Sequence, residues 1–407
     1  MVGCSFLCHA QAGSVTQQII NARILDGTGH EIESGWITIQ DDRIADLGSG
    51  APDSLIENHV DARGLTAVPG FIDTHRHFFA YTGIRTDGAL RRYRESQLPN
   101  ILSGLLHAGF TTIFSPGDHT PEIFLVRGDL RDGKLVGPRL LAAGRILHTS
   151  NDHPAATLCR RNRYCQRKLS AVVTDPENAR EQVRRIVNEG ADFIKAVHDR
   201  ELADRVVIDD AIIETIANEA LRLNVPFVLH TRDSADFARL AKRGVQRMVH
   251  TPLEGSIAQH IKPELLADLG VAAQTTLSWT SLQAARLRSP IQFSNSHFRL
   301  AQGMENVRFL VDHQLTVAFG TDNPPPLGHL NFMTEVHLLK QVLTNTEILK
   351  AMTQDAAIFL QLDSELGTLH PGKIADIVLL DGNPLMDINA LVRVHQVWQS
   401  GRAVRPR

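Results

Sequence analysis

The most informative stretch of this sequence reads Val68-Pro69-Gly70-Phe71-Ile72-Asp73-Thr74-His75-Arg76-His77-Phe78-Phe79. A Pro-Gly turn leads into a short apolar run, which ends in two histidines separated by one residue. Side chains alternate faces along a strand, so His75 and His77 should point the same way, about 7 Å apart. Imidazole is the commonest ligand of borderline metals. Among 19 histidines such a pair can arise by chance, so a metal site requires further ligands at the ends of later strands.

Length and composition set the broad class. The chain has 407 residues, 43% of them hydrophobic, and a formal net charge of -3. That length allows a large core with a smaller companion domain. The charge balance shows no bias toward nucleic acid, and no apolar run approaches the ~20 residues that span a bilayer. We expect a small-molecule substrate, no nucleic-acid partner and no membrane span, and we also expect a homo-oligomer.

The amino terminus allows two interpretations. Residues 2–8 are fairly apolar and precede Ala10-Gln11-Ala12-Gly13, which reads like a signal-peptidase site, although a basic region is missing. Residues 1–13 are therefore either a signal-peptide remnant or a disordered tail, with a periplasmic or secreted location favoured over a cytoplasmic one. Cys159 and Cys165 could close a small disulfide loop suited to an oxidising compartment. Two unrelated surface thiols fit the sequence equally well.

Both ends of the chain read as β-structure. Short apolar runs at 19–25, 36–40 and 43–47 are punctuated by turn residues, the pattern of an antiparallel meander. Segments 375–380 and 394–404 show the same pattern of short apolar runs. Neither end can bury much core alone, so residues 14–69 and 366–407 are predicted to pair into one small flanking β-sandwich domain.

Between these ends, strands alternate with helices. The strand-like runs are 71–77, 111–114, 139–143, 193–197, 227–230, 247–250, 271–276 and 316–319. Helical segments are expected at 176–188, 209–223, 235–242 and 263–268, the first opening with the N-cap signal Thr174-Asp175-Pro176-Glu177. Eight such units favour an α/β fold of the (β/α)8 TIM barrel type over a doubly wound sheet. The barrel is predicted to occupy residues 70–365.

Residues that can bind metal follow the later strands. Lys195, His230 and His250 close the fourth, fifth and sixth runs, and Asp322 lies just past the eighth. Barrel enzymes carry their active residues at these ends. Each histidine alone is more often a hydrogen-bonded edge residue, and an aspartate before a Pro-rich turn is usually a turn former. Lys195 is unusual, because a free ammonium is costly on a buried strand.

Taken together, these residues resemble the amidohydrolase superfamily. The matching pieces are His75-Arg76-His77, Lys195, His230, His250, Asp322 and the re-entry segment Leu366-Gly367-Thr368-Leu369-His370-Pro371-Gly372-Lys373-Ile374-Ala375-Asp376-Ile377-Val378. Within the superfamily, Gly109-Phe110-Thr111-Thr112 and Gly190-Ala191-Asp192-Phe193-Ile194-Lys195 are most similar to the prolidase and imidazolonepropionase-related branch.

The resemblance implies two divalent metal ions, most often zinc. The ligands would be His75, His77 and Asp322 for the more buried ion, and His230 and His250 for the other. A carbamate formed from Lys195 and CO2, together with a hydroxide, would bridge the ions. Two cations ~3.5–4 Å apart polarise a carbonyl and bring the pKa of bound water near 7. Asp322 would be catalytic, taking the proton of the attacking hydroxide and delivering it to the leaving group.

The loop after the third strand supplies candidate substrate contacts. Its sequence, Gly144-Arg145-Ile146-Leu147-His148-Thr149-Ser150-Asn151-Asp152-His153, resembles the loop whose last histidine contacts the substrate carbonyl. Ser150-Asn151-Asp152 departs from the usual Gly-rich run. His153 is the expected catalytic and substrate-binding residue, His148 is its competitor, and a histidine without a role is a third reading. Tyr81 is also expected near the substrate, with no assigned role.

Two basic loops would lie on the active face. They carry Arg85, Arg91, Arg92 and Arg94 after the first strand, and Arg160, Arg161, Arg163, Arg167 and Lys168 after the third. These groups could capture a carboxylate, although a solvated basic rim explains them equally well. The resulting hypothesis is an amidase or dipeptidase that cleaves an N-acyl amino acid or an Xaa-Pro dipeptide.

Several alternatives stand beside this hypothesis. A cyclic amide, lactone or phosphotriester hydrolase would use the same metal ligands. Deaminases of this fold usually lack the fourth-strand lysine and carry a Glu three residues after the fifth-strand histidine. Here Lys195 is present and Asp233 occupies that position, which disfavours deamination. A non-catalytic structural homologue would typically have lost metal ligands, and every ligand type is kept here.

Overall fold

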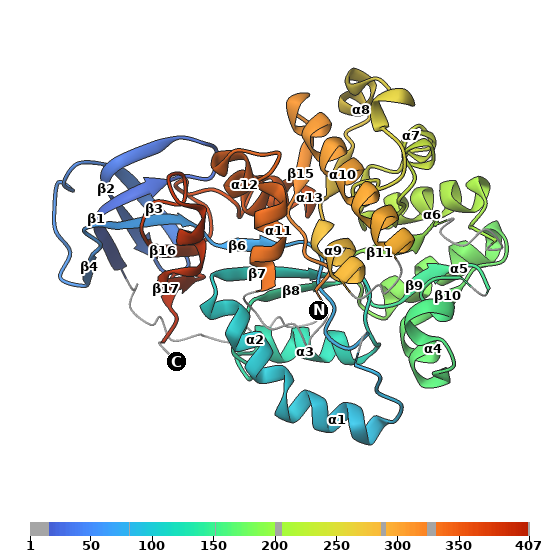
Figure 1. Cartoon of the computed structure of the whole chain (residues 1–407). Coiled ribbons are helices and arrows are strands. Elements are labelled where there is room, and N and C mark those ends of the chain that lie inside the picture. The colour runs from blue at the N-terminus through green and yellow to red at the C-terminus, as the bar shows by residue number, and fades with distance from the viewer. Residues whose placement is uncertain are drawn as a thin grey trace, which may run out of the picture.

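The computed structural model describes residues 16–80, 82–150, 152–199, 206–285, 290–323 and 331–405. Residues 1–13 and Tyr81 therefore lie outside the described part of the chain. Two bodies of structure lie side by side: a β-sheet layer, and parallel strands surrounded by helices (Figure 1). No helix in the described ranges is both long and apolar enough to cross a bilayer.

One sheet combines strands from both ends of the chain, in the order β18-β17-β16-β5-β1-β2-β3, with β4 pairing with β1. The strands are β1 (Thr16–Leu25), β2 (Glu31–Gln40), β3 (Arg43–Ser49), β4 (His59–Asp61), β5 (Leu65–Pro69), β16 (Ile377–Asp381), β17 (Val394–Gln399) and β18 (Arg402–Ala403). The expected antiparallel meander is β1-β2-β3. Beyond it, β4 and β5 run parallel to β1, because the chain crosses back to the other edge of β1 after β3. Antiparallel pairing of β5 with β16 joins the two ends.

Eight strand positions form the barrel, as predicted. They are β6 (Phe71–Asp73), β7 (Phe110–Ser115), β8 (Arg139–Ala142) continued by β9 (Ile146–His148), β11 (Ile194–Val197), β12 (Phe227–His230), β13 (Arg247–Val249), β14 (Ala272–Gln274) and β15 (Thr316–Ala318). The third strand is split at Gly144, which has a φ of 73°, so β8 pairs with β7 and β9 pairs with β11. The barrel closes where the Thr74 N–H donates to the Phe319 carbonyl at 3.0 Å. A short strand, β10 (Ser170–Val172), flanks β9.

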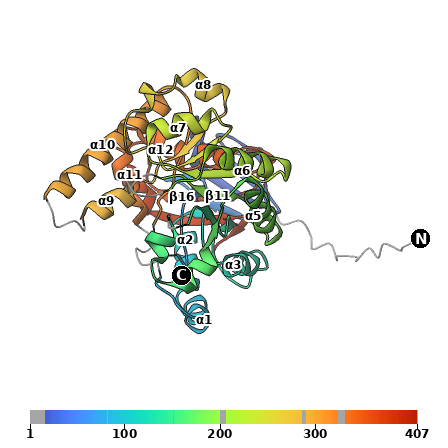
Figure 2. The same ribbon diagram turned by 90° about the vertical axis from the view of Figure 1, so that its right-hand side faces the viewer.

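Helices surround these strands, as the end-on view shows (Figure 2). They are α1 (Asp87–Ser96), α2 (Leu98–His107), α3 (Glu122–Arg131), the π-helical turn η1 (Ala155–Cys159), α4 (Arg163–Leu169), α5 (Pro176–Asn188), α6 (Asp210–Arg222), α7 (Ser234–Ala241), η2 (Ile257–Gln259), α8 (Pro263–Asp268), α9 (Leu277–Ala285), α10 (Pro290–Asp312), α11 (Phe332–Leu339), α12 (Asn345–Met352), α13 (Gln354–Phe359) and η5 (Ile388–Val392). The bounds of α5 and α8 are those expected from the sequence. Asp175 caps α5 by accepting the Asn178 N–H at 2.9 Å. A disulfide between Cys159 and Cys165 links η1 to α4.

The sheet and the barrel meet at Gly70, the single residue between β5 and β6. Its N–H donates to the Asp376 carbonyl at 2.9 Å. A Cβ at this position would lie 2.2 Å from Oγ1 of Thr111, so no residue larger than glycine fits. Arg139, on β8, donates to Oδ2 of Asp376 at 2.8 Å and to Oγ of Ser400 at 3.1 Å. These contacts fix the sheet against one side of the barrel.

Candidate metal centre

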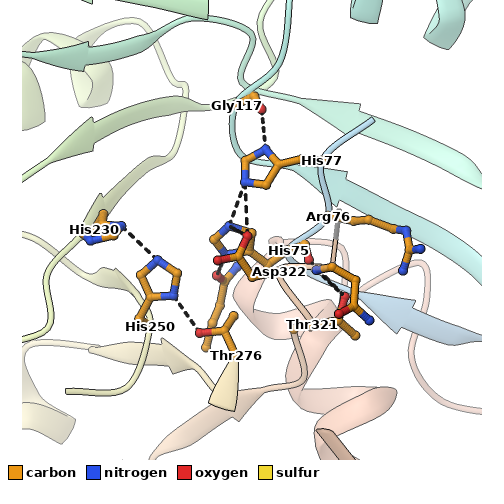
Figure 3. Close-up of polar contacts among 12 residues, drawn as sticks. His75, Arg76, His77, Gly117, His230, His250, Thr276, Thr321 and Asp322 are labelled. Atoms are coloured by element: carbon orange, nitrogen blue, oxygen red, sulfur yellow. Dashed lines mark hydrogen bonds and ion pairs between the residues drawn. The ribbon is translucent and has the colours of Figure 1, made fainter. Parts of the chain in front are cut away.

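Three donor atoms converge where the barrel closes. The Nε2 atoms of His75 and His77 lie 3.3 Å apart, and Oδ1 of Asp322 lies 3.5 and 3.3 Å from them (Figure 3). The histidines follow β6 rather than belonging to it, and Arg76 pairs with Asn323 in an isolated parallel bridge. All three ligand residues are buried, and within the described ranges Oδ1 of Asp322 has no hydrogen-bond partner. A triangle of this size can surround one cation.

Hydrogen bonds on the far side of each ring determine its tautomer, and so whether Nε2 carries a proton or a free lone pair. Nδ1 of His75 lies 2.9 Å from Oε1 of Gln274, whose amide nitrogen donates to the Thr74 carbonyl at 2.6 Å. Nδ1 of His77 donates to the Gly117 carbonyl at 2.5 Å. Carbonyl oxygens only accept, so both Nδ1 atoms carry the proton and both Nε2 atoms offer a lone pair. Two lone pairs and a carboxylate oxygen are a donor set for a divalent metal.

His230 and His250 form a second pair, at the ends of β12 and β13. Nδ1 of His230 lies 2.9 Å from Nε2 of His250 (Figure 3). The opposite nitrogens contact Oδ2 of Asp199 at 3.0 Å and Oγ1 of Thr276 at 2.6 Å. The Thr276 hydroxyl donates its own proton to the Thr275 carbonyl, so both opposite nitrogens are donors. The two nitrogens that face each other are therefore both unprotonated, an arrangement that a shared cation would stabilise.

Burial keeps most of these rings neutral. It lowers the pKa of His75, His230 and His250 well below the usual 6.5. For His77, burial also lowers the pKa, but the Asp322 and Asp118 carboxylates and the Gly117 carbonyl together outweigh it, and the net pKa is raised. The rings of His75 and His250 lie 5.0 Å apart, so the two clusters adjoin. The donor set of His75, His77 and Asp322 therefore fits a divalent ion, and the second pair of imidazoles adjoins it.

Lys195 lies on β11, borders the same cavity and is only 3% exposed. Burial lowers the pKa of its ammonium to about 7, with Asp322 opposing the shift. A large share of these side chains is therefore an uncharged amine at neutral pH. That is the form that reacts with CO2, as the carbamate prediction requires.

Three residues of the site have a left-handed backbone. His250, Thr276 and Asp322, which follow β13, β14 and β15, have φ values of 73°, 57° and 50°. This conformation costs of order 1–3 kcal/mol for a non-glycine residue and is least tolerable for β-branched threonine. Such strain concentrates at functional sites, where the surrounding structure holds side chains in required positions.

Two buried aspartates hold the segment that carries the first histidines. Asp73 accepts the His75 N–H at 3.1 Å and the Thr321 hydroxyl at 2.7 Å, which ties β6 to the Asp322 loop. Asp118 accepts the N–H groups of residues 78, 79 and 80 at 2.6, 2.7 and 2.9 Å. Both carboxylates are almost completely buried. The chain on either side of the His-x-His pair is thus fixed by a charge-assisted hydrogen-bond network.

The two clusters open into a cavity of about 510 Å³. The ring of His153 stacks 5.3 Å from that of His230 on its wall, and its Nδ1 lies 2.7 Å from Oγ1 of Thr157. Besides these residues and the ligands, the lining includes Ile146, Leu158, Leu253, Trp279, Arg160 and Arg232. The cavity therefore combines an apolar wall with two guanidinium groups.

Some predicted residues lie elsewhere. His148 is fully buried and lines a separate cavity of about 480 Å³. Among the described members of the two basic loops, only Arg160 borders the metal-centre cavity. Lys168 pairs instead with Glu122 at 2.6 Å. Asp233, at the position that disfavours deamination, caps α7 by accepting the Asp236 N–H at 2.9 Å.

The residues that orient the ligands were not predicted from the sequence. They are Asp73, Gly117, Asp118, Asp199, Arg232, Gln274 and Thr276. A positional signal existed for some of them. Asp199 and Arg232 come shortly after Lys195 and His230, and Gln274 closes the seventh strand. Which acceptor serves which ring depends on pairings across the barrel, which one sequence does not reveal.

Comparisons with known proteins identify similar sequences and structures. Residues 66–404 match the model of the amidohydrolase family. The imidazolonepropionase of Thermoanaerobacter pseudethanolicus is 24% identical over 372 residues, covering 86% of this chain and 85% of that protein. The ochratoxinase of Aspergillus niger is 24% identical over 428 residues, covering 93% and 84%. A solved structure of a Xaa-Pro dipeptidase with bound methionine has a TM-score of 0.79 at 20% identity, and covers 96% of this chain and 100% of that one.

Proposed function

Since this chain belongs to the amidohydrolase family, in its prolidase and imidazolonepropionase-related branch, we propose that it is a binuclear hydrolase of amide bonds beside a free carboxylate. As a member it is a metal-dependent hydrolase acting on carbon–nitrogen bonds. The observation that carries the proposal is the pair of adjoining clusters, His75–His77–Asp322 and His230–His250, whose facing atoms are lone pairs and a carboxylate oxygen. The proposed substrate is an N-acyl amino acid or an Xaa-Pro dipeptide.

The cavity lining supports this substrate class. A carboxylate next to the scissile amide would meet the guanidinium groups of Arg160 or Arg232. The apolar wall would receive an uncharged acyl group or side chain. The name of one similar structure, a Xaa-Pro dipeptidase, supports the dipeptide as a candidate substrate.

The residues have the following proposed roles. Two divalent ions, taken to be zinc, would polarise the scissile carbonyl and would lower the pKa of a bound water molecule to about 7. Asp322 accepts the proton of the attacking water and passes it to the leaving amine. His153 donates a hydrogen bond to the carbonyl oxygen from the cavity wall. The Lys195 amine would form an N–C bond with CO2 and release a proton, and the resulting carbamate would provide oxygen ligands for the metal centre.

Metal content, measured by elemental analysis, tests the centre. Protein produced with added zinc and bicarbonate should hold close to two ions per chain. Lys195→Ala should lose most of this metal, because the shared ligand is gone. Lys340→Ala, which removes an exposed lysine at the end of α11, should keep the wild-type content. One ion per chain, unchanged in Lys195→Ala, would remove Lys195 from the site and leave a mononuclear hydrolase or a deaminase.

Kinetics test the substrate class. N-acyl amino acids or Xaa-Pro dipeptides with a free carboxylate should show a kcat/KM at least about 10-fold above that of their carboxamide counterparts. A hydrogen bond to a charged group is worth about 1.5–3 kcal/mol, which corresponds to such a ratio. Equal rates for both forms would show that no carboxylate is recognised.

The location is also a proposal. The buried Cys159–Cys165 disulfide supports a periplasmic or secreted protein, since such bonds persist in oxidising compartments. Finding both thiols free in protein isolated from its native source under alkylating conditions would contradict it.

A further inference from the structure

The four histidines of the metal centre do not have equivalent partners. His75 and His77 donate to an amide oxygen and a backbone carbonyl, and His250 donates to a hydroxyl. On the side of the ring that faces away from the converging donor atoms, His230 donates to a carboxylate, Oδ2 of Asp199, at 3.0 Å. A carboxylate behind a metal-bound imidazole raises the basicity of that ring as a ligand. The second cluster therefore depends on one charged residue in a way that the first does not.

The environment of Asp199 explains how this charge is tolerated. Asp199 follows β11, four residues after Lys195, and is only 6% exposed. The same Oδ2 atom lies 3.0 Å from Nε and 2.8 Å from Nη2 of Arg232. Arg232 lies two residues after His230, in the segment that follows β12. Because the guanidinium offsets the cost of burying the carboxylate, Asp199 can stay close to His230 inside the protein.

We infer that Asp199 is the positioning residue of the second metal site. By accepting the proton of Nε2, it holds His230 in the tautomer that leaves the Nδ1 lone pair facing His250. It thereby sets the affinity for the ion held by His230 and His250. The ion held by His75, His77 and Asp322 is independent of Asp199. This inference rests on the proposed two-metal centre.

Two substitutions separate the charge of Asp199 from its hydrogen bond. Asp199→Asn keeps an oxygen that can accept from His230 and Arg232 but removes the charge, whereas Asp199→Ala removes both. Loss of such a partner typically costs about 10-fold to 100-fold in metal affinity. We expect about 10-fold for Asp199→Asn and a larger loss for Asp199→Ala, both confined to the ion held by His230 and His250. Asp233→Asn is the matched control, because Asp233 lies in the same segment after β12 and its side chain caps α7.

The test is zinc binding by metal-free protein, measured by competition with a chromogenic chelator at fixed bicarbonate, together with far-UV circular dichroism. The expected result is two binding steps in wild type and Asp233→Asn, with one of the two steps shifted and the other unchanged in Asp199→Asn. Unchanged affinities in Asp199→Asn, or an equal loss in both steps while the fold is kept, would overturn the inference. If Asp199→Ala does not fold, the zinc affinities of Asp199→Asn alone test the inference. One ion per wild-type chain would overturn the two-metal proposal and this inference with it.

Discussion

Asp118 illustrates how much of the site depends on single buried residues. It accepts three consecutive backbone N–H groups just beyond His77, and the Ser115 hydroxyl at 2.9 Å. Gly117, its neighbour, accepts the proton of the His77 ring. One short turn after β7 therefore holds both the backbone and the ring of a metal ligand.

Asp118→Ala should lower the free energy of unfolding by about 3 kcal/mol or more, because several buried donors lose their acceptor and each costs about 1–3 kcal/mol. Urea denaturation measures this change, and zinc content should fall with it. Asp132→Ala, at an exposed position after α3, should change stability by about 0.5 kcal/mol or less. Equal effects of the two substitutions would show that the turn does not need the carboxylate.

The residues of the metal centre were predictable to different degrees. The ligand candidates could be found because each stands at the end of an apolar strand, where a barrel gathers its polar groups. The hydrogen-bond partners of these ligands could not be predicted. Gln274 is far from His75 in sequence, and any polar residue could have accepted the hydrogen bond from the His75 ring. The predicted competitor His148 fell on β9, where the split third strand turns its side chain toward a different cavity.

At the scale of secondary-structure elements, α11 is attached to the start of α9 by a buried carboxyl group. Glu335, on α11, accepts the N–H groups of Leu277 and Ser278 at 2.9 and 2.5 Å. The Ser278 hydroxyl in turn donates to the Thr321 carbonyl at 2.9 Å. This connection supports the backbone next to both Thr276 and Asp322.

Burial raises the pKa of Glu335 from 4.5 to about 7, although the N–H donors oppose the shift. Between pH 4.5 and about 7, the Glu335 carboxyl group is ionised in the unfolded chain but keeps its proton in the folded protein. The stability that Glu335 contributes is therefore complete below pH 4.5 and is lost as the pH rises toward 7. The free energy of unfolding of wild type, relative to Glu335→Gln, should fall by on the order of 2–3 kcal/mol across this window. Urea denaturation at several pH values measures the difference, and parallel curves for the two proteins would contradict it.

Local signals decided which elements could be predicted. The start of α5 was readable because Asp175 and Pro176 form a cap that needs no tertiary contact. The break between β8 and β9 could not be predicted from the sequence, because it follows from how Gly144 fits between two neighbouring strands. The parallel placement of β4 and β5 beside β1 was equally hidden, since it depends on which edge of the sheet was still open.

At the scale of the whole molecule, we propose a division into a β-sandwich domain, residues 14–69 and 366–407, and a barrel, residues 70–365. We expect the two to unfold together. Arg139, Asp376 and Gly70 link them through buried or partly buried hydrogen bonds, and only one residue separates β5 from β6.

Scanning calorimetry of the wild type should therefore show one transition. Asp376→Ala should lower its midpoint without splitting it, because Arg139 and the Ser400 N–H lose their acceptor. Two separated transitions in the wild type would show that the domains are thermodynamically independent.

The pairing of β5 with β16 also has a consequence for synthesis on the ribosome. Val68 lies opposite Val378 in the finished sheet, and the entire barrel is translated between them. At about 5–20 residues per second, the nascent β5 waits roughly 15–60 s for its partner strand. During that time one of its edges offers unpaired backbone groups, which are a template for pairing with another chain. The sheet can therefore be completed only after the whole barrel has been synthesised, and the nascent chain is most exposed to misassembly just before that step.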